Sequence, residues 1–111
     1  MIGDKDLALA GKMLDILSTQ HKLSAHNLAN ADVQGFRPLK ADFRKELARA
    51  IESGDTKALK EISVEVERAR QPGVDSEREV ARMAKNEVMF NTFAEIAAFR
   101  LRMLRSAVTS K

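Results

Sequence analysis

Few side chains in this sequence could carry chemistry, and most of them lie near the end of its first helical pattern. His21 and His26 are five residues apart, whereas two metal ligands on one helical face need a spacing of three or four. His21 falls on the apolar side of the pattern, which favours an imidazole packed in a core or interface. Ser18 and Ser24 lack an acidic partner and the sharp turn that exposes a nucleophile. We therefore expect no enzyme activity, no metal site and no cofactor.

The remaining polar candidates are better suited to holding structure together. Asn27 and Asn30 can bond to backbone groups at a helix end or across an interface. Glu87 is the one charge on the apolar seam of the last helical pattern. It can pair with a polar group on a facing helix and so fix the register, or it can lie at the exposed edge. No glycine-rich phosphate loop is present.

The elements that position these residues begin with a long helix predicted over residues 4–31. Apolar residues recur there at alternating steps of three and four, which is a coiled-coil-like seam. A second row lies beside the seam and indicates a second packing face. The seam consists of Leu7, Ala10, Leu14, Leu17, His21, Ser24, Leu28 and Ala31, and the second row of Leu9, Met13, Ile16, Gln20 and Leu23.

A longer helix is predicted over residues 76–110. Ser76 and Glu79 form a capping-box pattern at its start. Two apolar rows make this helix apolar on more than one face. Its seam consists of Val80, Met83, Glu87, Phe90, Ala94, Ala97, Leu101, Leu104 and Val108, and its second row of Met89, Phe93, Ile96 and Met103, with Phe99 beside it.

The middle segment, residues 32–75, carries weaker signals. Phe43, Leu47 and Ile51 recur at a spacing of four and predict a short amphipathic helix over residues 42–52. Asp55 can cap a further helical turn that ends at Leu59. Residues 62–67 alternate between apolar and polar types, which predicts a β-strand that needs a partner.

Together these patterns predict a mainly α fold in which the long N- and C-terminal helices pair antiparallel, in coiled-coil fashion, around a short middle segment. We expect one elongated domain over residues 1–111. About 35 helical residues span about 50 Å, whereas a compact chain of this length is only about 35 Å across. The extra apolar face is then available to other chains. The alternative is a helical hairpin that buries all its apolar faces internally.

Composition narrows the class of protein further. Apolar residues make up 44% of the chain and aromatic residues only 5%, which favours helices over sheets. There is no cysteine, so disulfides and thiolate chemistry are excluded. No apolar run approaches the roughly 20 residues of a transmembrane helix. The N-terminus is acidic, unlike a secretory signal, so we expect the chain to stay in the cytoplasm or to leave without a cleaved signal.

The net charge of +3 comes from the C-terminal third, where Arg100, Arg102, Arg105 and Lys111 follow the last acidic residue, Glu95. Cations there complement the negative end of a helix dipole. The sharper interpretation, a nucleic-acid site, lacks an aromatic stacking platform and any recognised motif. We therefore expect no nucleic-acid partner.

The most distinctive stretch follows the first helical pattern. It reads Asn27-Leu28-Ala29-Asn30-Ala31-Asp32 and, after two residues, Gly35-Phe36-Arg37. Gly35 can adopt a positive φ and so allows a tight turn. Phe36 is an apolar plug behind the turn, and Pro38 prevents the helix from continuing.

This stretch resembles the N-terminal signature of the flagellar rod and hook axial proteins. That signature runs approximately Asn-Leu-Ala-Asn-Ala-Asn/Asp-Thr-Pro-Gly-Tyr/Phe-Lys/Arg, and Val33 and Gln34 stand here where it has Thr-Pro. The matching residues are Asn27, Leu28, Ala29, Asn30, Gly35 and Phe36. The last helical segment also looks like the terminal helix of the rod proteins, through Met83, Asn86, Phe90, Leu101 and Leu104. Within the family, the short proximal-rod proteins are the most similar.

The resemblance implies a structural subunit of the bacterial flagellar basal body, located in the periplasmic rod that transmits torque to the hook. It implies antiparallel terminal helices that assemble with copies of the chain, with other rod proteins, and with the rod adaptor at the MS-ring junction. It also implies passage through the flagellar type III export apparatus without a cleaved signal peptide. The subunit-packing residues would be Leu7, Leu14, Leu17, Leu28, Val80, Met83, Phe90, Leu101, Leu104 and Val108. The alternatives are a small cytoplasmic helical adaptor or export chaperone, and a nucleic-acid-binding helical protein.

Overall fold

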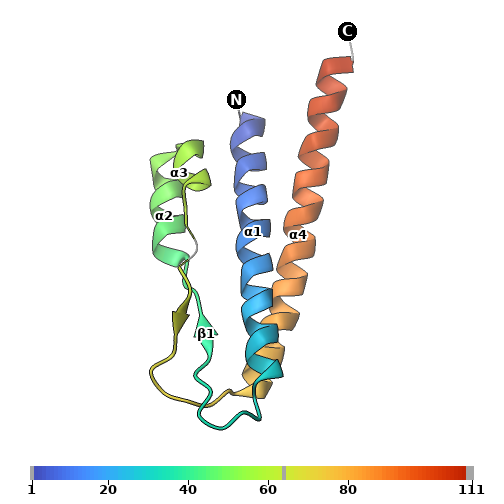
Figure 1. Cartoon of the computed structure of the whole chain (residues 1–111). Coiled ribbons are helices and arrows are strands. Elements are labelled where there is room, and N and C mark those ends of the chain that lie inside the picture. Colours follow the sequence, from blue (N-terminus) through green and yellow to red (C-terminus); the bar gives the residue numbers. More distant parts are fainter. Residues whose placement is uncertain (1, 64, 110–111) are drawn as a thin grey trace.

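Two long helices set the shape of the molecule. In the computed structural model, which describes residues 2–63 and 65–109, α1 spans Ile2–Ala29 and α4 spans Ser76–Thr109. They pack antiparallel, so α1 begins and α4 ends at the same end of the molecule (Figure 1). The principal extents are 63 × 25 × 14 Å. The predicted fold class, mainly α with paired terminal helices, is confirmed, and so is the elongated shape. Ser110, the last residue of the predicted helix, lies outside the described residues.

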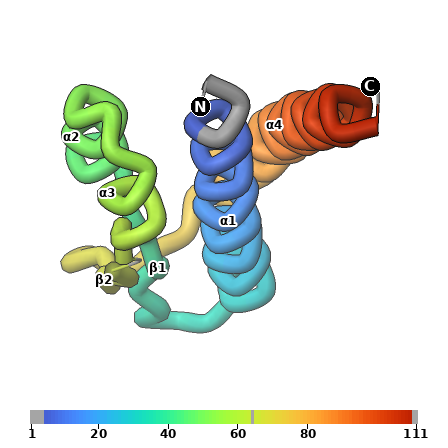
Figure 2. The backbone as a smooth tube through the Cα atoms, turned by 90° about the horizontal axis from the view of Figure 1, so that it is seen from above, coloured from blue at the N-terminus to red at the C-terminus, as the bar shows by residue number. Residues whose placement is uncertain are grey.

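The middle segment forms an arm, defined here as residues 39–68. It consists of β1 (Leu39–Lys40), α2 (Arg44–Ser53), α3 (Thr56–Lys60) and β2 (Glu67–Arg68). The two strands pair antiparallel, with Leu39 opposite Arg68. α1 lies between the arm and α4 (Figure 2). Across the described elements, neither α2 nor α3 packs against α4. α1 is therefore the shared support for both sides of the molecule.

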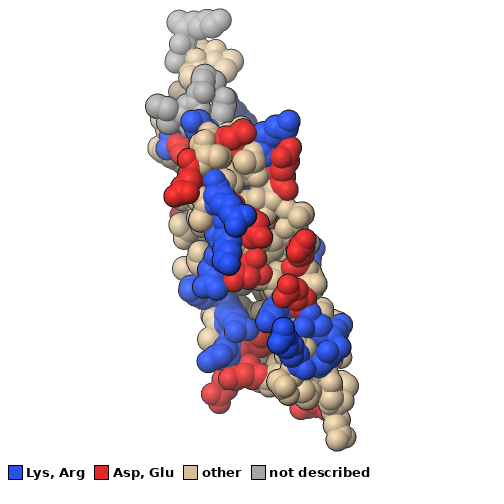
Figure 3. All heavy atoms as spheres, turned by 90° about the vertical axis from the view of Figure 1, so that its left-hand side faces the viewer, with Lys and Arg blue, Asp and Glu red and all other residues tan. Residues whose placement is uncertain are grey.

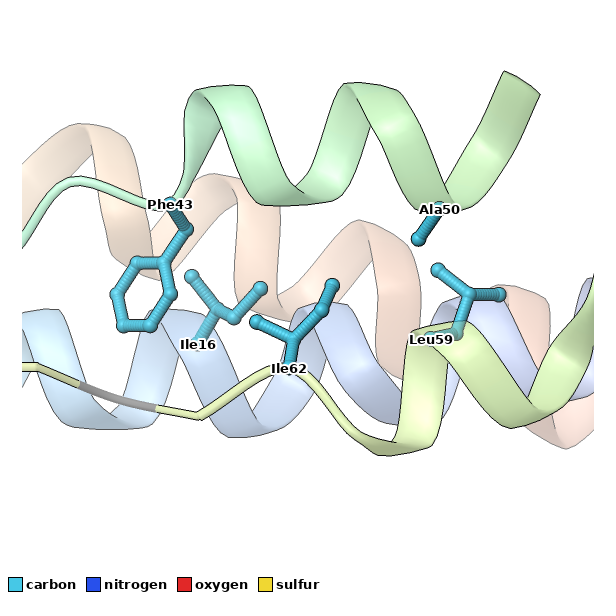
Figure 4. Close-up of a cluster of buried hydrophobic side chains, with 5 residues drawn as sticks. All are labelled: Ile16, Phe43, Ala50, Leu59 and Ile62. Atoms are coloured by element: carbon cyan, nitrogen blue, oxygen red, sulfur yellow. The ribbon is translucent and has the colours of Figure 1, made fainter. Parts of the chain in front are cut away.

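A small apolar core fastens the arm to α1. The buried cluster joins one α1 residue to the arm and is drawn in Figure 4; its members are Ile16, Phe43, Ala50, Leu59 and Ile62. Leu9 and Met13 pack against it, so the predicted second row of α1 is the face that holds the arm. Lys12 adds a polar link, because its Nζ donates a hydrogen bond of 2.7 Å to the Ile62 carbonyl.

The predicted helical turn at Asp55 and the predicted short amphipathic helix are both confirmed, and two details of the helix differ from the prediction. The Asp55 carboxylate accepts from the Lys57 N–H at 2.9 Å and caps α3. α2 begins at Arg44 rather than at residue 42. Ile51 is 51% exposed, while Ala50 is buried. Ala50 rather than Ile51 therefore belongs to the inward face of α2.

The predicted strand over residues 62–67 is wrong in extent. β2 covers only Glu67–Arg68, and the described residues before it have no strand structure; Val64 lies outside the described residues. Ile62 is buried in the arm core, whereas Val66 is exposed. The segment stays irregular because β1, its sheet neighbour, offers only two residues for pairing.

The face of α4 that packs on α1 is displaced from the predicted seam. Val80, Glu87, Leu101 and Val108 are exposed, while Met83, Ala94, Ala97 and Leu104 are half-buried. Three residues outside the predicted seam take their place: Glu79 is buried, and Asn86 and Phe93 are half-buried. Because α4 carries two apolar rows, periodicity alone could not select the row that faces α1.

The cap of α4 also differs from the predicted capping box. The Asp75 carboxylate accepts from the Arg78 N–H at 3.1 Å, so Asp75 is the N-cap residue. Glu79 turns away from the cap and pairs with Arg82 at 2.8 Å. The helix begins at Ser76, as predicted, and Ser76 is its first residue rather than its cap.

The cap assignment predicts a difference between two alanine substitutions. Asp75→Ala removes the N-cap acceptor and is expected to lower the free energy of unfolding by about 1 kcal/mol. Ser76→Ala should change it by less than about 0.5 kcal/mol. Urea unfolding followed by circular dichroism measures both values. A larger loss for Ser76→Ala than for Asp75→Ala would contradict the assignment.

Candidate functional site

The signature stretch forms the junction between α1 and the arm, and Asn27 is its central residue. Asn27 is 2% exposed. Its Nδ2 donates to the Leu39 carbonyl and its Oδ1 accepts from the Leu39 N–H, both at 2.8 Å. One side chain thus satisfies both backbone groups of the first residue of β1. Asn27 therefore fixes where the arm leaves the end of α1, and the expectation that it bonds to backbone is confirmed.

The rest of the signature closes the turn. Asn30 donates from Nδ2 to the His26 carbonyl at 2.8 Å, which satisfies an acceptor at the helix end. Gly35 has φ of 78°, as its place in the turn predicted. Ala29 is the exposed last residue of α1, and Leu28 is half-buried. The motif residues are thus occupied mainly with the local fold.

Phe36 is held between an imidazole and a guanidinium. Its ring lies edge-on to His26, with 5.7 Å between the ring centroids. The Arg68 guanidinium lies 5.6 Å from the centroid of the same ring, within cation–π range. The Phe36 carbonyl accepts from the Gly73 N–H at 2.9 Å. Phe36 therefore connects α1, β2 and the segment that leads into α4.

Two glycines should respond in opposite directions to alanine. Gly35→Ala places a side chain at φ of 78° and is expected to cost about 1–2 kcal/mol of stability. Gly11 lies inside α1 with no atom within 4 Å of an added Cβ, so Gly11→Ala should raise stability by about 1 kcal/mol. Thermal and urea unfolding of the two variants measure these changes. A gain from Gly35→Ala would argue against the left-handed turn.

The largest uncovered apolar surface lies on α4. Four of its apolar residues form an exposed row on one flank of the helix, and two of them, Ile96 and Phe99, also line a hollow beside Leu9 of α1. We call this row the outer stripe; it consists of Val88, Ile96, Phe99 and Met103. Val88 is 66% exposed and Phe99 is 52% exposed. Exposed apolar residues in a row are typical of an interaction site rather than of scattered surface residues.

The arm presents a different surface. Figure 3 shows this side of the molecule, where basic and acidic side chains are interspersed along its length. Among them, Arg44 pairs with Asp42 at 2.8 Å. Hydrogen bonding from the Arg44 side chain lowers the pKa of Asp42 from 3.8 to about 2. The outer face of the arm is therefore a charged surface, in contrast to the outer stripe of α4.

Three surface hollows lie along the pair formed by α1 and α4, and two of them are shallow hollows on its opposite sides. On one side, a shallow hollow of about 410 Å³ includes His21, Glu87 and Phe90. His21 is exposed there, so it is not packed in a core; its packing in an interface stays a prediction. Glu87 is exposed as well, which matches its edge interpretation. On the other side, a hollow of about 510 Å³ includes Leu9 of α1 and Phe99 of α4.

The third hollow, which we call the arm groove, lies over α1 between the arm and α4. Its volume is about 620 Å³. Met13 and Gln20 of α1, Leu47 of α2 and Met89 of α4 are among the residues that line it. Lys40 lines it from β1, and Glu79, Arg82 and Lys85 line it from α4. Sequence reasoning did not predict this groove, because no local pattern reveals that α2 and α4 leave α1 uncovered between them.

The predicted subunit-packing residues divide into two groups. Leu17 is buried, and Leu7, Leu14, Leu28, Met83 and Leu104 are half-buried, which places this group at or near the helix pair. Val80, Phe90, Leu101 and Val108 are exposed. Asp6 of α1 and Arg100 of α4 form an ion pair at 2.7 Å near the open end of the pair. The exposed group, from Val80 to Val108, is therefore accessible to neighbouring protein chains.

Among residues 2–63 and 65–109, no group of three His, Asp or Glu side chains could hold a metal ion. Across the same residues, no helix combines the length and hydrophobicity that crossing a bilayer requires. The candidate sites described above are the junction around Asn27, the outer stripe and the arm groove. Searches of protein-family models and of curated proteins found no match to this chain.

Proposed function

We propose that this chain is a structural subunit of the bacterial flagellar basal-body rod, of the proximal-rod type, which assembles through its two terminal helices. The observation that carries the proposal is the signature from Asn27 to Phe36. The antiparallel pairing of α1 and α4 agrees with the arrangement that the family resemblance implies. The non-enzymatic, periplasmic role and export without a cleaved signal belong to the same proposal.

The exposed faces of α4 support self-assembly. α4 packs on α1 along one side, while the outer stripe stays uncovered. Burying apolar surface is worth about 25 cal/mol per Å², so neighbouring subunits that cover the stripe would gain free energy. A subunit joined to copies of itself, to other rod proteins and to the rod adaptor at the MS-ring junction would use such faces.

The experiment compares assembly and motility. Deleting the gene from its host should leave cells without hook or filament, and the intact gene should restore both. The double variant Val88→Asp with Phe99→Asp should fold as a monomer but fail to restore motility or to join rod assemblies. Asn91→Asp, an exposed polar change on the same helix, is the matched control and should restore motility.

Two results would contradict the proposal. Normal flagella in the deletion strain would exclude an essential rod subunit. A stable dimer whose mass never changes with concentration or added rod proteins would favour the small cytoplasmic adaptor or export chaperone instead. Amide hydrogen exchange over α1 and α4 separates the two cases, because an assembly subunit should gain protection in both helices only on assembly.

A further inference from the structure

The arm groove runs along α1 between the arm and α4. Ile16 packs in the arm core, and Leu17 lines a hollow that α1 forms with α4. Successive helical residues are about 100° apart, so Met13 and Gln20 lie between these two directions around α1, and both line the groove. Met13 also packs against the arm core. The groove thus has a floor on α1 and walls from the arm and α4, a shape that can receive one more helix.

The floor of the groove suits an apolar helical stripe. Met13, Leu47 and Met89 contribute apolar surface from three different helices, and all three are half-buried. Methionine side chains adapt their shape to a docking partner. A helix lying along α1 would contact α1, α2 and α4 together, which is the helix-in-groove mode of recognition.

The charged residues on the walls of the arm groove indicate which side chains would flank the apolar stripe of a docked helix. Asp42 is paired with Arg44, and Glu79 with Arg82, each at 2.8 Å. Lys40 on β1 and Lys85 on α4 line opposite walls. No ion pair within the described parts of the chain engages either lysine. Glu67 is the register partner of Lys40 across the two-stranded sheet but forms no ion pair with it. The walls thus carry two lysines that are free to pair with carboxylates of a docked chain.

One buried acceptor also lacks a donor. The Glu79 side chain is 7% exposed, and its Oε2 has no hydrogen-bond partner although Oε1 is bonded to Arg82. A buried carboxylate oxygen is normally satisfied, and leaving it without a donor is costly. Since Glu79 lines the same groove, a docked chain that supplies a donor would relieve this cost.

We propose that the arm groove binds an amphipathic helix of a partner protein. Its apolar stripe lies on Met13, Leu47 and Met89, and carboxylates on both sides of the stripe pair with Lys40 and Lys85. A hydrogen-bond donor near one end of the helix reaches Glu79. This inference goes beyond the proposed rod function and is independent of it, because it rests on the groove and its charges rather than on the signature.

The test uses the full chain and two synthetic 18-residue helical peptides. Both carry the same leucine stripe; one has glutamate on both flanks and the other has lysine. Fluorescence anisotropy at physiological salt should show the glutamate peptide binding at least tenfold more tightly. In the double variant Lys40→Glu with Lys85→Glu, the preference should reverse toward the lysine peptide. Lys22→Glu, an exposed change outside the groove, is the matched control and should leave the preference unchanged.

Equal affinity for the two peptides, or a preference unmoved by the double variant, would overturn the proposal. So would the absence of binding by either peptide; a doubled mass in sedimentation would then show that a second copy of the chain fills the groove. Peptide binding with the expected charge reversal, in a chain that never joins rod assemblies, would uphold the groove while contradicting the rod function.

Discussion

Asn27→Ala is expected to lower the free energy of unfolding by about 3 kcal/mol. The substitution removes two hydrogen bonds of 2.8 Å and leaves both the N–H and the carbonyl of Leu39 without partners. Each lost bond counts for about 1 kcal/mol, and the unsatisfied backbone groups add to this cost. Urea unfolding followed by circular dichroism measures the change.

Two companion variants separate the junction from a general effect of losing asparagine. Asn30→Ala removes a single exposed bond to the His26 carbonyl and should cost less than about 1 kcal/mol. Asn27→Asp keeps an acceptor for the Leu39 N–H but sets a carboxylate against the Leu39 carbonyl. It should therefore be at least as destabilising as Asn27→Ala.

Asn27→Ala should raise amide exchange around β1 more than it raises exchange in the rest of the chain. Because Asn27 anchors β1, amide exchange should rise first at Ala69, whose N–H donates to the Pro38 carbonyl at 2.7 Å beside the sheet. The middle of α4 should keep its protection longer. Equal losses for Asn27→Ala and Asn30→Ala would show that the bidentate contact is not what holds the arm.

The long helices were predictable because their information is local. Periodicity at steps of three and four over many turns, as from Leu7 to Leu28, is a strong signal, and α1 and α4 appear within two residues of their predicted bounds. The turn at Gly35 was predictable for the same reason, since a short-range pattern needs only its own residues.

The failures occur where a distant partner decides the outcome. Residues 62–67 alternate like a strand, but strand structure requires an edge to pair with, and β1 supplies only two residues. Ile62 is drawn into the arm core instead, where Lys12 also bonds to its carbonyl. Nothing in the local pattern of Lys12 indicates a contact fifty positions away.

Which face of α4 packs on α1 could not be predicted, because α4 carries two apolar rows. With two apolar rows, small differences in packing choose between them, and Phe93 is packed in preference to Val80. The same ambiguity leaves the outer stripe uncovered. The sequence therefore predicted that the last helix has apolar residues on two faces. It did not predict which of these residues would be exposed. The signature residues were predictable by position, while the Leu39 partner of Asn27 was not.

Phe43→Ala is expected to lower the free energy of unfolding by about 4 kcal/mol. Phe43 is 5% exposed and fills the core between α1, α2 and the chain after α3 (Figure 4). Removing its ring leaves a cavity that the short arm cannot close, since its other core members are small or already packed. Thermal unfolding and amide exchange over α2 and α3 measure the loss.

Phe99→Ala is the matched control, because the same side chain is removed from the outer stripe. Phe99 is about half exposed and lines a hollow beside Leu9 of α1, so in the isolated chain its loss should cost only about 1 kcal/mol. Similar losses for the two variants would mean that the outer stripe is packed in solution by something the single chain does not show. If the losses differ as expected, Phe43 is committed to the fold, and Phe99 keeps its apolar surface for a neighbour. A larger cost for Phe99→Ala should then emerge in the assembled state.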